Sequence, residues 1–177
     1  EIVDIKTTDT FSGILAVVSV SEISLDDMDL ESPIICMNKI GDPGNLGTII
    51  RTADWFGIKN ILLSEGSVDP YNEKVVRSTM GSLFRATIVE SESIVDNITF
   101  LKESHGYNIV GLAMDGKSMS ELGNNQQKKT VYIFGSESHG LSREIEPLLD
   151  ETYTIEGRGK AESLNVAVAA GIVLSKL

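Results

Sequence analysis

Residues 33–57 have the sequence PIICMNKIGDPGNLGTIIRTADWFG, which predicts a strand, a turn and a helix in direct succession. Residues 33–40 are a short, apolar, β-branched run, which is typical of a buried strand. From residue 45 to residue 56 apolar side chains recur every three or four positions, which predicts a helix with one buried face. Gly57 ends this pattern, because glycine most easily adopts the left-handed conformation that closes a helix. The stretch therefore predicts one strand-helix unit of an α/β fold.

The same alternation continues along the chain. Short β-branched runs predict further strands at residues 13–20, 60–63, 86–89, 108–113, 131–134 and 152–155. Helical spacing predicts further helices at residues 73–83, 93–104, 142–149 and about 163–177. The last of these is apolar on most of its circumference, so we expect it to be packed on several sides, against a sheet face or a subunit interface. Together these elements predict an α/β sandwich around a mainly parallel sheet, with ligand sites at the carboxyl ends of the strands.

Length and composition favour one compact domain without metals or disulfides. The chain has 177 residues, with 41% hydrophobic and 23% charged residues, as in an ordinary soluble globular protein. The longest apolar stretch, within residues 166–174, is far shorter than the roughly 20 residues that a membrane span needs. Cys36 is the single cysteine, and two histidines with one thiol do not make a usual zinc site. We expect a cytoplasmic protein with no metal and no membrane segment.

The formal net charge of −11 disfavours a nucleic-acid partner. The uneven distribution of charge along the chain, however, leaves room for a nucleic-acid partner. Residues 21–32 carry five acids and no base, and we interpret them as a solvated linker. Basic residues lie in or near the segments singled out below and are the candidates for contact with phosphates. They are Arg77, Arg85, Arg143, Arg158 and Lys160.

The first segment that could carry chemistry is residues 42–57, a turn that leads into a helix. The simpler interpretation is a loop and a core helix, with Asn45 as the helix N-cap and Arg51 as a surface charge. Spacing alone favours that interpretation. The alternative is that both side chains face a ligand, since loops at strand ends are where ligands bind in α/β folds.

The second and third segments are residues 131–143 and 155–171. In the second, two glycines bracket Glu137, so that backbone can approach a ligand closely, while Ser142 is interpreted as a helix cap. In the third, two glycines flank Arg158, and Ser163 and Asn165 introduce an otherwise apolar helix. A buried amide at Asn165 would need a partner, either structural or a ligand, because an unpaired one costs roughly 1–3 kcal/mol.

Three rival motifs fail on inspection. A phosphate loop would need glycine at Thr154 and a hydroxyl residue at Ala161. A dinucleotide fingerprint starting at residue 157 fails because Glu162 stands where the third glycine belongs. The serines and histidine of residues 136–139 lack the G-x-S-x-G turn of a hydrolase. A generic nucleotide-binding α/β enzyme and a hydrolase are both disfavoured.

Taken in order, the three segments resemble the motifs of the SpoU (TrmH-like) ribose methyltransferases of the SPOUT superfamily. The matching stretches are NLGTIIRTA at 45–53, FGSESHGLS at 134–142 and ESLNVAVAA at 162–170. Residues 75–85 also resemble the family's segment between the first two motifs. The chain departs from the family pattern at Ser136, a position often held by asparagine, and at Glu156, which replaces a common proline. The resemblance covers about residues 33–177.

The resemblance implies a fold, a cofactor and an oligomeric state. The fold is a mainly parallel sheet with helices on both faces, whose C-terminal part is threaded into a deep trefoil knot. The cofactor is S-adenosylmethionine (AdoMet), bound in the knot mainly by backbone at strand ends. The implied cofactor residues are Leu112, Ala113, Met114, Gly135, Ile155, Ser163 and Leu164. The implied assembly is a homodimer with the active site completed across the interface, which suits the apolar last helix.

The implied activity is methylation of a ribose 2′-hydroxyl in structured RNA. By resemblance Arg51 meets that hydroxyl, and four residues orient it and the substrate, namely Asn45, Glu137, Ser163 and Asn165. A guanidinium stays protonated in nearly every protein setting, so we do not expect it to act as a base. Our hypothesis is that Arg51 holds the adjacent phosphate and stabilises the developing alkoxide while the proton leaves to phosphate or water.

Residues 13–20 resemble the end of the ribosomal-protein-like RNA-binding domain that many members carry. We therefore divide the chain into residues 1–32, a remnant of that domain plus the acidic linker, and residues 33–177, the methyltransferase domain. Because the chain begins at Glu1 rather than Met, we expect the rest of the first domain to have been removed. The remnant favours ribosomal over transfer RNA as the substrate. The alternative function is a non-catalytic RNA-binding or ribosome-assembly protein with the same fold.

Overall fold

A six-stranded sheet forms the centre of the molecule in the computed structural model, which describes residues 16–122, 129–136 and 139–177. The strand order is β3-β2-β1-β5-β4-β6, and every neighbouring pair is parallel. The strands are β1 (Ile34–Met37), β2 (Asn60–Leu63), β3 (Thr87–Glu90), β4 (Asn108–Ser118), β5 (Thr130–Phe134) and β6 (Glu151–Thr154). The predicted mainly parallel α/β sheet is therefore confirmed.

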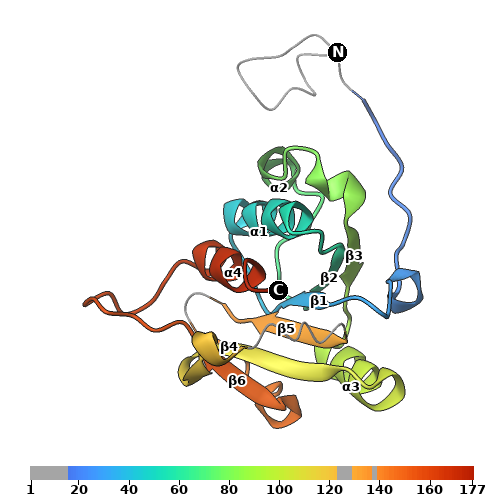
Figure 1. Ribbon diagram of the computed structural model, residues 1–177. Coiled ribbons are helices and arrows are strands. Elements are labelled where there is room, and N and C mark those ends of the chain that lie inside the picture. The colour runs from blue at the N-terminus through green and yellow to red at the C-terminus, as the bar shows by residue number, and fades with distance from the viewer. Residues whose placement is uncertain (1–15, 123–128, 137–138) are drawn as a thin grey trace.

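Helices cover both faces of this sheet (Figure 1). They are α1 (Pro43–Trp55), α2 (Glu73–Ser78), α3 (Ile94–His105) and α4 (Val166–Leu174). Short 3₁₀ turns are η1 (Leu25–Asp27), η2 (Ser82–Arg85), η3 (Met119–Glu121) and η4 (Glu146–Leu148). Figure 1 shows α1, α2 and α4 on one face and α3 on the other. None of the helices in the described part of the chain is long and apolar enough to cross a membrane.

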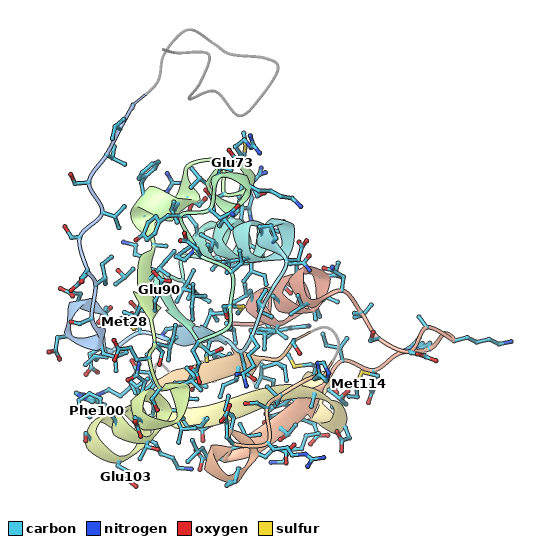
Figure 2. All side chains as sticks on the ribbon, turned by 180° about the vertical axis from the view of Figure 1, so that it is seen from behind. Met28, Glu73, Glu90, Phe100, Glu103 and Met114 are labelled. Atoms are coloured by element: carbon cyan, nitrogen blue, oxygen red, sulfur yellow. The ribbon has the colours of Figure 1, made fainter. Side chains whose placement is uncertain are left out.

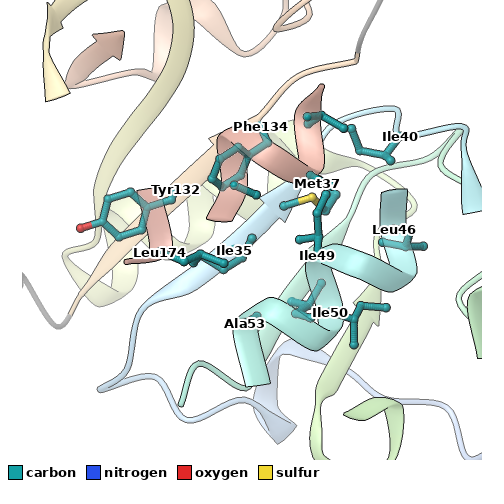
Figure 3. Packing of buried hydrophobic residues seen from close by; sticks show 14 of the residues in the cluster. Ile35, Met37, Ile40, Leu46, Ile49, Ile50, Ala53, Tyr132, Phe134 and Leu174 are labelled. Atoms are coloured by element: carbon teal, nitrogen blue, oxygen red, sulfur yellow. The ribbon is translucent and has the colours of Figure 1, made fainter. Parts of the chain in front are cut away.

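The central strand β1 is buried on both faces and builds two cores. All four of its residues are buried, as expected for a parallel strand covered by helices on each side. Because successive side chains point to opposite faces, Ile35 and Met37 pack with α1 and α4, whereas Ile34 and Cys36 pack with α3. Figure 3 shows the first of these cores, in which Ile35 and Met37 lie among side chains of α1, β5 and α4.

Three predicted helices differ from the observed ones. The helix predicted at 73–83 ends at Ser78, because Met80 and Gly81 adopt left-handed φ angles of 51° and 89° that interrupt it. The helix predicted at 142–149 was wrong. Only the 3₁₀ turn η4 forms there, and it contains Pro147, which lacks the N–H that a longer helix would need. The last helix begins at Val166 rather than at residue 163.

The N-terminal predictions also need correction. Residues 16–20 form no strand, and Val17 and Val18 are exposed, since no neighbouring strand pairs with them. Residues 13–15 lie outside the described residues. The acidic stretch 21–32 is only partly solvated, because Met28 is 5% exposed and packs into the core beside α3. Figure 2 shows Met28 where η1 meets the body of the molecule.

The C-terminal part of the chain returns from the far edge of the sheet to its centre. After β6, the last strand in the order, the chain runs through residues 155–165 and then forms α4, which packs beside α1 (Figure 1). A Cβ on Gly171 of α4 would lie 3.9 Å from the Thr52 Cγ2 atom of α1, an ordinary contact. On its return, α4 packs into the same core as side chains of β5 and β1. The trefoil knot stays a prediction from the resemblance.

Candidate functional site

Three loops meet at the carboxyl edge of the sheet. They follow β1 (residues 38–42), β5 (residues 135–142) and β6 (residues 155–165). Because all six strands are parallel, their carboxyl ends share one edge, so segments distant in sequence gather there. The three loops are also the three segments singled out from the sequence.

The loop after β1 presents Asn45 on the first turn of α1. The N-cap of α1 is Asp42, whose carboxylate accepts a hydrogen bond of 2.7 Å from the Asn45 N–H, and Pro43 follows at the first helical position. The simpler interpretation, in which Asn45 itself is the N-cap, was therefore wrong. Its side chain instead accepts a hydrogen bond of 3.0 Å from the Asn165 amide.

The loop after β6 ends at Asn165, which caps α4. Its Oδ1 atom accepts hydrogen bonds from the Ala167 N–H at 2.9 Å and the Val168 N–H at 3.3 Å. Its Nδ2 atom donates to the Asn45 Oδ1 atom, 120 positions away in the sequence. The partner that the sequence required for Asn165 is thus structural, although the residue is exposed and not buried. This hydrogen bond fixes the third loop to the first.

Arg51 lies about 1.7 turns beyond Asn45 on α1 and is exposed. Its side chain makes no hydrogen bond or ion pair with the described residues. The neighbouring Thr52 faces α4, so Arg51 projects from a helix that is packed against the helix capped by Asn165. Ser163 is exposed on the loop two residues before that cap. Glu137, the remaining predicted catalytic residue, lies outside the described residues.

The loop after β5 is a tight turn built on two glycines. Ser136 and Gly140 pair in both directions, with N–H to O distances of 3.0 and 2.9 Å, and Gly140 has a left-handed φ of 67°. A Cβ on Gly135 would lie 2.1 Å from the Gly140 carbonyl carbon, so only glycine fits there without moving backbone.

Asn38, at the end of β1, holds this second loop in place and was not predicted. Its Oδ1 atom accepts a 2.9 Å hydrogen bond from the Ser142 N–H, and its own N–H donates to the Phe134 carbonyl at 2.8 Å. Ser142 is therefore held in a loop, and its interpretation as a helix cap was wrong. The strand predicted at residues 33–40 enclosed Asn38, so the one signal that could have marked it was an amide within a mostly apolar run.

A small cavity of about 350 Å³ opens beside this contact, at the carboxyl ends of β1 and β5. Its lining comprises Asn38, Lys39, Ser136, His139, Gly140 and Ser142. The Asn38 Nδ2 atom and the Ser142 Oγ atom are both buried and have no hydrogen-bond partner among the described residues. Unsatisfied buried polar groups are rare in folded proteins, so this pair calls for an explanation.

The predicted cofactor residues come from the ends of three neighbouring strands. Leu112 on β4 pairs with Phe134, which precedes Gly135, and with Tyr153, two residues before Ile155. Leu112, Gly135 and Ile155 therefore sit at one edge.

Residues 113–116 bulge out of the β4·β6 pairing, since the register shifts between Leu112 and Lys117. Within this bulge the Met114 carbonyl accepts a 3.0 Å hydrogen bond from the Thr154 hydroxyl. Met114 and Leu164 expose 70% and 47% of their surface. Figure 2 shows Met114 on the side from which the loop of residues 155–165 projects. The bulge therefore presents backbone groups and apolar side chains beside that loop.

The predicted phosphate-contacting cations fall into two groups. Arg77 pairs with Glu73 at 3.6 Å, and the Arg85 guanidinium binds both carboxylate oxygens of Asp54, which lowers the pKa of that carboxyl. Arg143, Arg158 and Lys160 are exposed, and their side chains make no ion pair with the described residues. The free cations lie on or next to the second and third loops. No group of three or more potential metal ligands gathers within the described ranges.

Comparison with known proteins places this arrangement among methyltransferases. Residues 32–175 match the profile of the SpoU rRNA Methylase family. The 23S rRNA (guanosine(2553)-2′-O)-methyltransferase RlmP of Bacillus subtilis is 35% identical over 147 residues, covering 81% of this chain and 57% of that protein.

Two solved structures are also similar. The SpoU methyltransferase AviRb from Streptomyces viridochromogenes, in complex with AdoMet, has a TM-score of 0.80 at 29% identity and covers 88% of this chain and 64% of its own. An AdoMet-bound rRNA methyltransferase from Sinorhizobium meliloti has a TM-score of 0.76 at 34% identity, with coverages of 82% and 55%. The chain thus spans between half and two thirds of the length of each of these three proteins.

Proposed function

The chain belongs to the SpoU rRNA Methylase family, and from this premise we propose that it transfers the methyl group of AdoMet to a ribose 2′-hydroxyl of structured RNA. Ribosomal RNA is favoured over transfer RNA. The Bacillus subtilis relative is named as a 23S rRNA 2′-O-methyltransferase, and the AviRb structure holds AdoMet. The observation that carries the proposal is the Asn45–Asn165 hydrogen bond, since it joins the first and third motif segments at the strand ends.

The residues at the strand ends fit AdoMet. Gly135 leaves no room for a side chain, so backbone lines this position, and the bulge after Leu112 presents further backbone groups. Met114, within the bulge, and Leu164, on the loop of residues 155–165, offer exposed apolar side chains. Backbone hydrogen-bonding groups flanked by apolar side chains suit a ligand with a flat heterocycle and polar edges. Ala113, Ile155 and Ser163 complete the proposed cofactor residues. When bound, AdoMet supplies a methyl group on a positively charged sulfur.

The remaining work falls to the side chains of this protein. Methyl transfer requires the ribose oxygen to be aligned with the methyl carbon and sulfur, so positioning dominates. Asn165, held by Asn45 and by the start of α4, gives the third loop a defined place. Arg51 has no hydrogen-bond or ion-pair partner in the part of the chain that the structure describes, and it holds the phosphate next to the target ribose. Its charge stabilises the alkoxide as the hydroxyl proton leaves to phosphate or water. Glu137 and Ser163 orient the substrate.

A conservative variant of Arg51 tests this role. Arg51→Lys keeps the charge but removes the planar, two-pronged guanidinium. We expect kcat to fall by about 10²-fold or more, as for loss of a donor that acts on transition-state charge, while the AdoMet Kd stays unchanged. Lys59→Arg is the matched control, because Lys59 lies before β2, at the opposite edge of the sheet. Near-normal turnover of Arg51→Lys would exclude the proposed role.

Cofactor binding separates the proposed function from its alternatives. Isothermal titration calorimetry of the full chain with AdoMet and with ATP should show binding of AdoMet alone. A generic nucleotide-binding enzyme would bind ATP. A non-catalytic RNA-binding protein would bind RNA without transferring a methyl group. Binding of neither nucleotide would remove the basis for the proposal.

We also propose a homodimer formed through the outer face of α4. Val168 and Ile172, one turn apart, are 51% and 36% exposed, and exposed apolar surface of this kind marks interaction sites. Val168→Glu should convert the dimer to a monomer in sedimentation or light scattering. Val17→Glu, at a position 91% exposed and remote from α4, should not. A wild-type chain that is monomeric at all concentrations would contradict the dimer.

Two further assignments accompany this function. Residues 33–177 form the methyltransferase domain, and residues 1–32 are the remnant of an RNA-binding domain plus the acidic linker. Arg143, Arg158 and Lys160 form a cationic rim around the loops and contact RNA phosphates, with Arg77 and Arg85 contributing if they leave their acidic partners. The site of action is the cytoplasm.

A further inference from the structure

Two polar groups beside the cavity at the ends of β1 and β5 can donate hydrogen bonds to a ligand. The Asn38 Oδ1 atom already accepts from the Ser142 N–H, so the two Nδ2 hydrogens are the unused part of that amide. The Ser142 hydroxyl likewise has no partner within the described ranges. Asn38 is completely buried, so its amide cannot be satisfied by moving to the surface. A ligand rich in acceptors would satisfy both groups.

Lys39 is the one cationic side chain in the described lining of the cavity. Lys39 lines the cavity, and its ammonium lies 3.2 Å from the Glu144 carboxylate. Both side chains are nearly half exposed, and ion pairs at such positions contribute little, so Lys39 can turn towards a ligand at small cost. The backbone conformation holds Lys39 there, since its left-handed φ of 59° and its N–H donating to the Ser64 hydroxyl at 2.8 Å fix the turn.

Size and lining distinguish a phosphate from a nucleobase. The volume of about 350 Å³ is at the lower end of ligand pockets, which suits one phosphate group with its ester arms. Protein sites for unpaired bases stack them on aromatic side chains. The described residues of the lining include no Phe, Tyr or Trp, and His139 is the single ring among them. Two uncharged donors and an ammonium are a usual set of phosphate contacts.

We propose that this cavity binds a backbone phosphate of the substrate RNA, with Asn38, Ser142 and Lys39 as its donors. The proposal rests on the proposed function and adds a second phosphate contact to that of Arg51. Because Asn38 also holds the loop after β5, phosphate binding here would couple RNA docking to the position of the loop that follows Gly135. Among anions, the competing source is the carboxylate of AdoMet itself.

Nuclear magnetic resonance titration of the full chain tests the proposal with three probes at millimolar concentration. Inorganic phosphate and uridine 3′-monophosphate should shift the Asn38 side-chain amide and the Ser142 backbone amide, whereas uridine should not. Equal shifts with uridine would make the cavity a base site and overturn the proposal. No shift with either phosphate would also overturn it.

Two variants identify the donors. Asn38→Asp keeps the acceptor for the Ser142 N–H but replaces the donor with a second oxygen, so phosphate affinity should fall at least about fivefold. Ser142→Ala removes a hydroxyl that has no protein partner, so the fold should tolerate it while phosphate binding weakens. Asn72→Asp, the same change at the exposed N-cap of α2, is the control and should bind phosphate normally. Normal phosphate affinity in both test variants would overturn the proposal.

A parallel AdoMet titration of the same samples separates this proposal from the proposed function. The AdoMet Kd should be unchanged in Ser142→Ala. A weakened AdoMet Kd with unchanged phosphate affinity would assign the cavity to the cofactor carboxylate and overturn the proposal. Failure of the wild-type chain to bind AdoMet would refute the proposed function, while the phosphate titration would still report on the cavity.

Discussion

Replacement of Asn165 should separate its two structural roles. Asn165→Ala removes both the cap of α4 and the hydrogen bond to Asn45. Loss of a cap costs about 1 kcal/mol, and loss of an exposed hydrogen bond costs about 0.5–1 kcal/mol. The free energy of unfolding should therefore fall by about 1.5–2 kcal/mol, which lowers Tm by about 3–8 °C in a chain of this length.

Asn165→Asp removes only one of these roles. Its carboxylate still accepts from the Ala167 and Val168 N–H groups and interacts favourably with the helix N-terminus. It cannot donate to the Asn45 Oδ1 atom, so the loss should be limited to about 0.5–1 kcal/mol. A double-mutant cycle that combines Asn45→Ala with Asn165→Ala should give a coupling energy of about 0.5–1 kcal/mol. When Asp occupies position 165, the coupling energy between positions 45 and 165 should be near zero.

Urea unfolding at pH 7, followed by far-ultraviolet circular dichroism, measures these differences. Ser93→Ala is the matched control, because Ser93 caps α3 by accepting from the Asp96 N–H and makes no bond to another loop. It should cost about 1 kcal/mol and show no coupling to Asn45. Equal losses for Asn165→Ala and Asn165→Asp, or a coupling energy of zero, would refute the claim that this hydrogen bond ties the first and third loops together.

Three further variants probe the loop after β5, the edge of the sheet and the N-terminal segment. Gly135→Ala should destabilise the fold by about 1–3 kcal/mol or displace its loop and weaken AdoMet binding, because the new Cβ meets backbone. Gly157→Ala places its Cβ in open space, so it should change neither the free energy of unfolding nor AdoMet binding. Burial works to raise the pKa of Asp150, but hydrogen bonds from Lys102 and a backbone N–H outweigh it and lower the pKa below 3.8. The carboxylate of Asp150 therefore contributes its full stabilisation above about pH 3.8, and this contribution is lost as the pH falls through the lower folded-state pKa. Asp150→Asn should flatten the acid limb of the profile of unfolding free energy against pH, measured with urea. An unchanged acid limb would contradict this assignment. Met28→Ala should cost about 2–5 kcal/mol, because Met28 is buried in the core beside α3. A negligible change in the urea midpoint would restore the interpretation of a solvated linker.

Local patterns predicted most of the sheet but not all of its boundaries. The β-branched runs of β1, β2 and β5 are buried on both sides and stand out in the sequence for that reason. Residues 13–20 have a similar composition, yet the described part forms no strand, because a strand also needs a neighbour to pair with. The length of β4 depends on its irregular pairing with β6, which no local pattern encodes.

The site was predictable as segments but not as contacts. Asn45 and Asn165 stand at turns that the sequence marks clearly, whereas their hydrogen bond joins positions 120 residues apart and depends on the return of the chain to α1. Asn38 was missed for the same reason, since its partner Ser142 is 104 residues away. The roles of Arg51 and Glu137 came from the resemblance and stay predictions.

The most direct test of the proposed function is nucleoside mass spectrometry of RNA methylated by this chain. The full chain is incubated with AdoMet carrying an isotopically labelled methyl group and with 23S ribosomal RNA, and the RNA is digested to nucleosides. We expect the label on the ribose of a single nucleoside, as a 2′-O-methyl group, and its loss in Arg51→Lys. A label on a base, or AdoMet binding without any transfer to RNA, would contradict the proposed function.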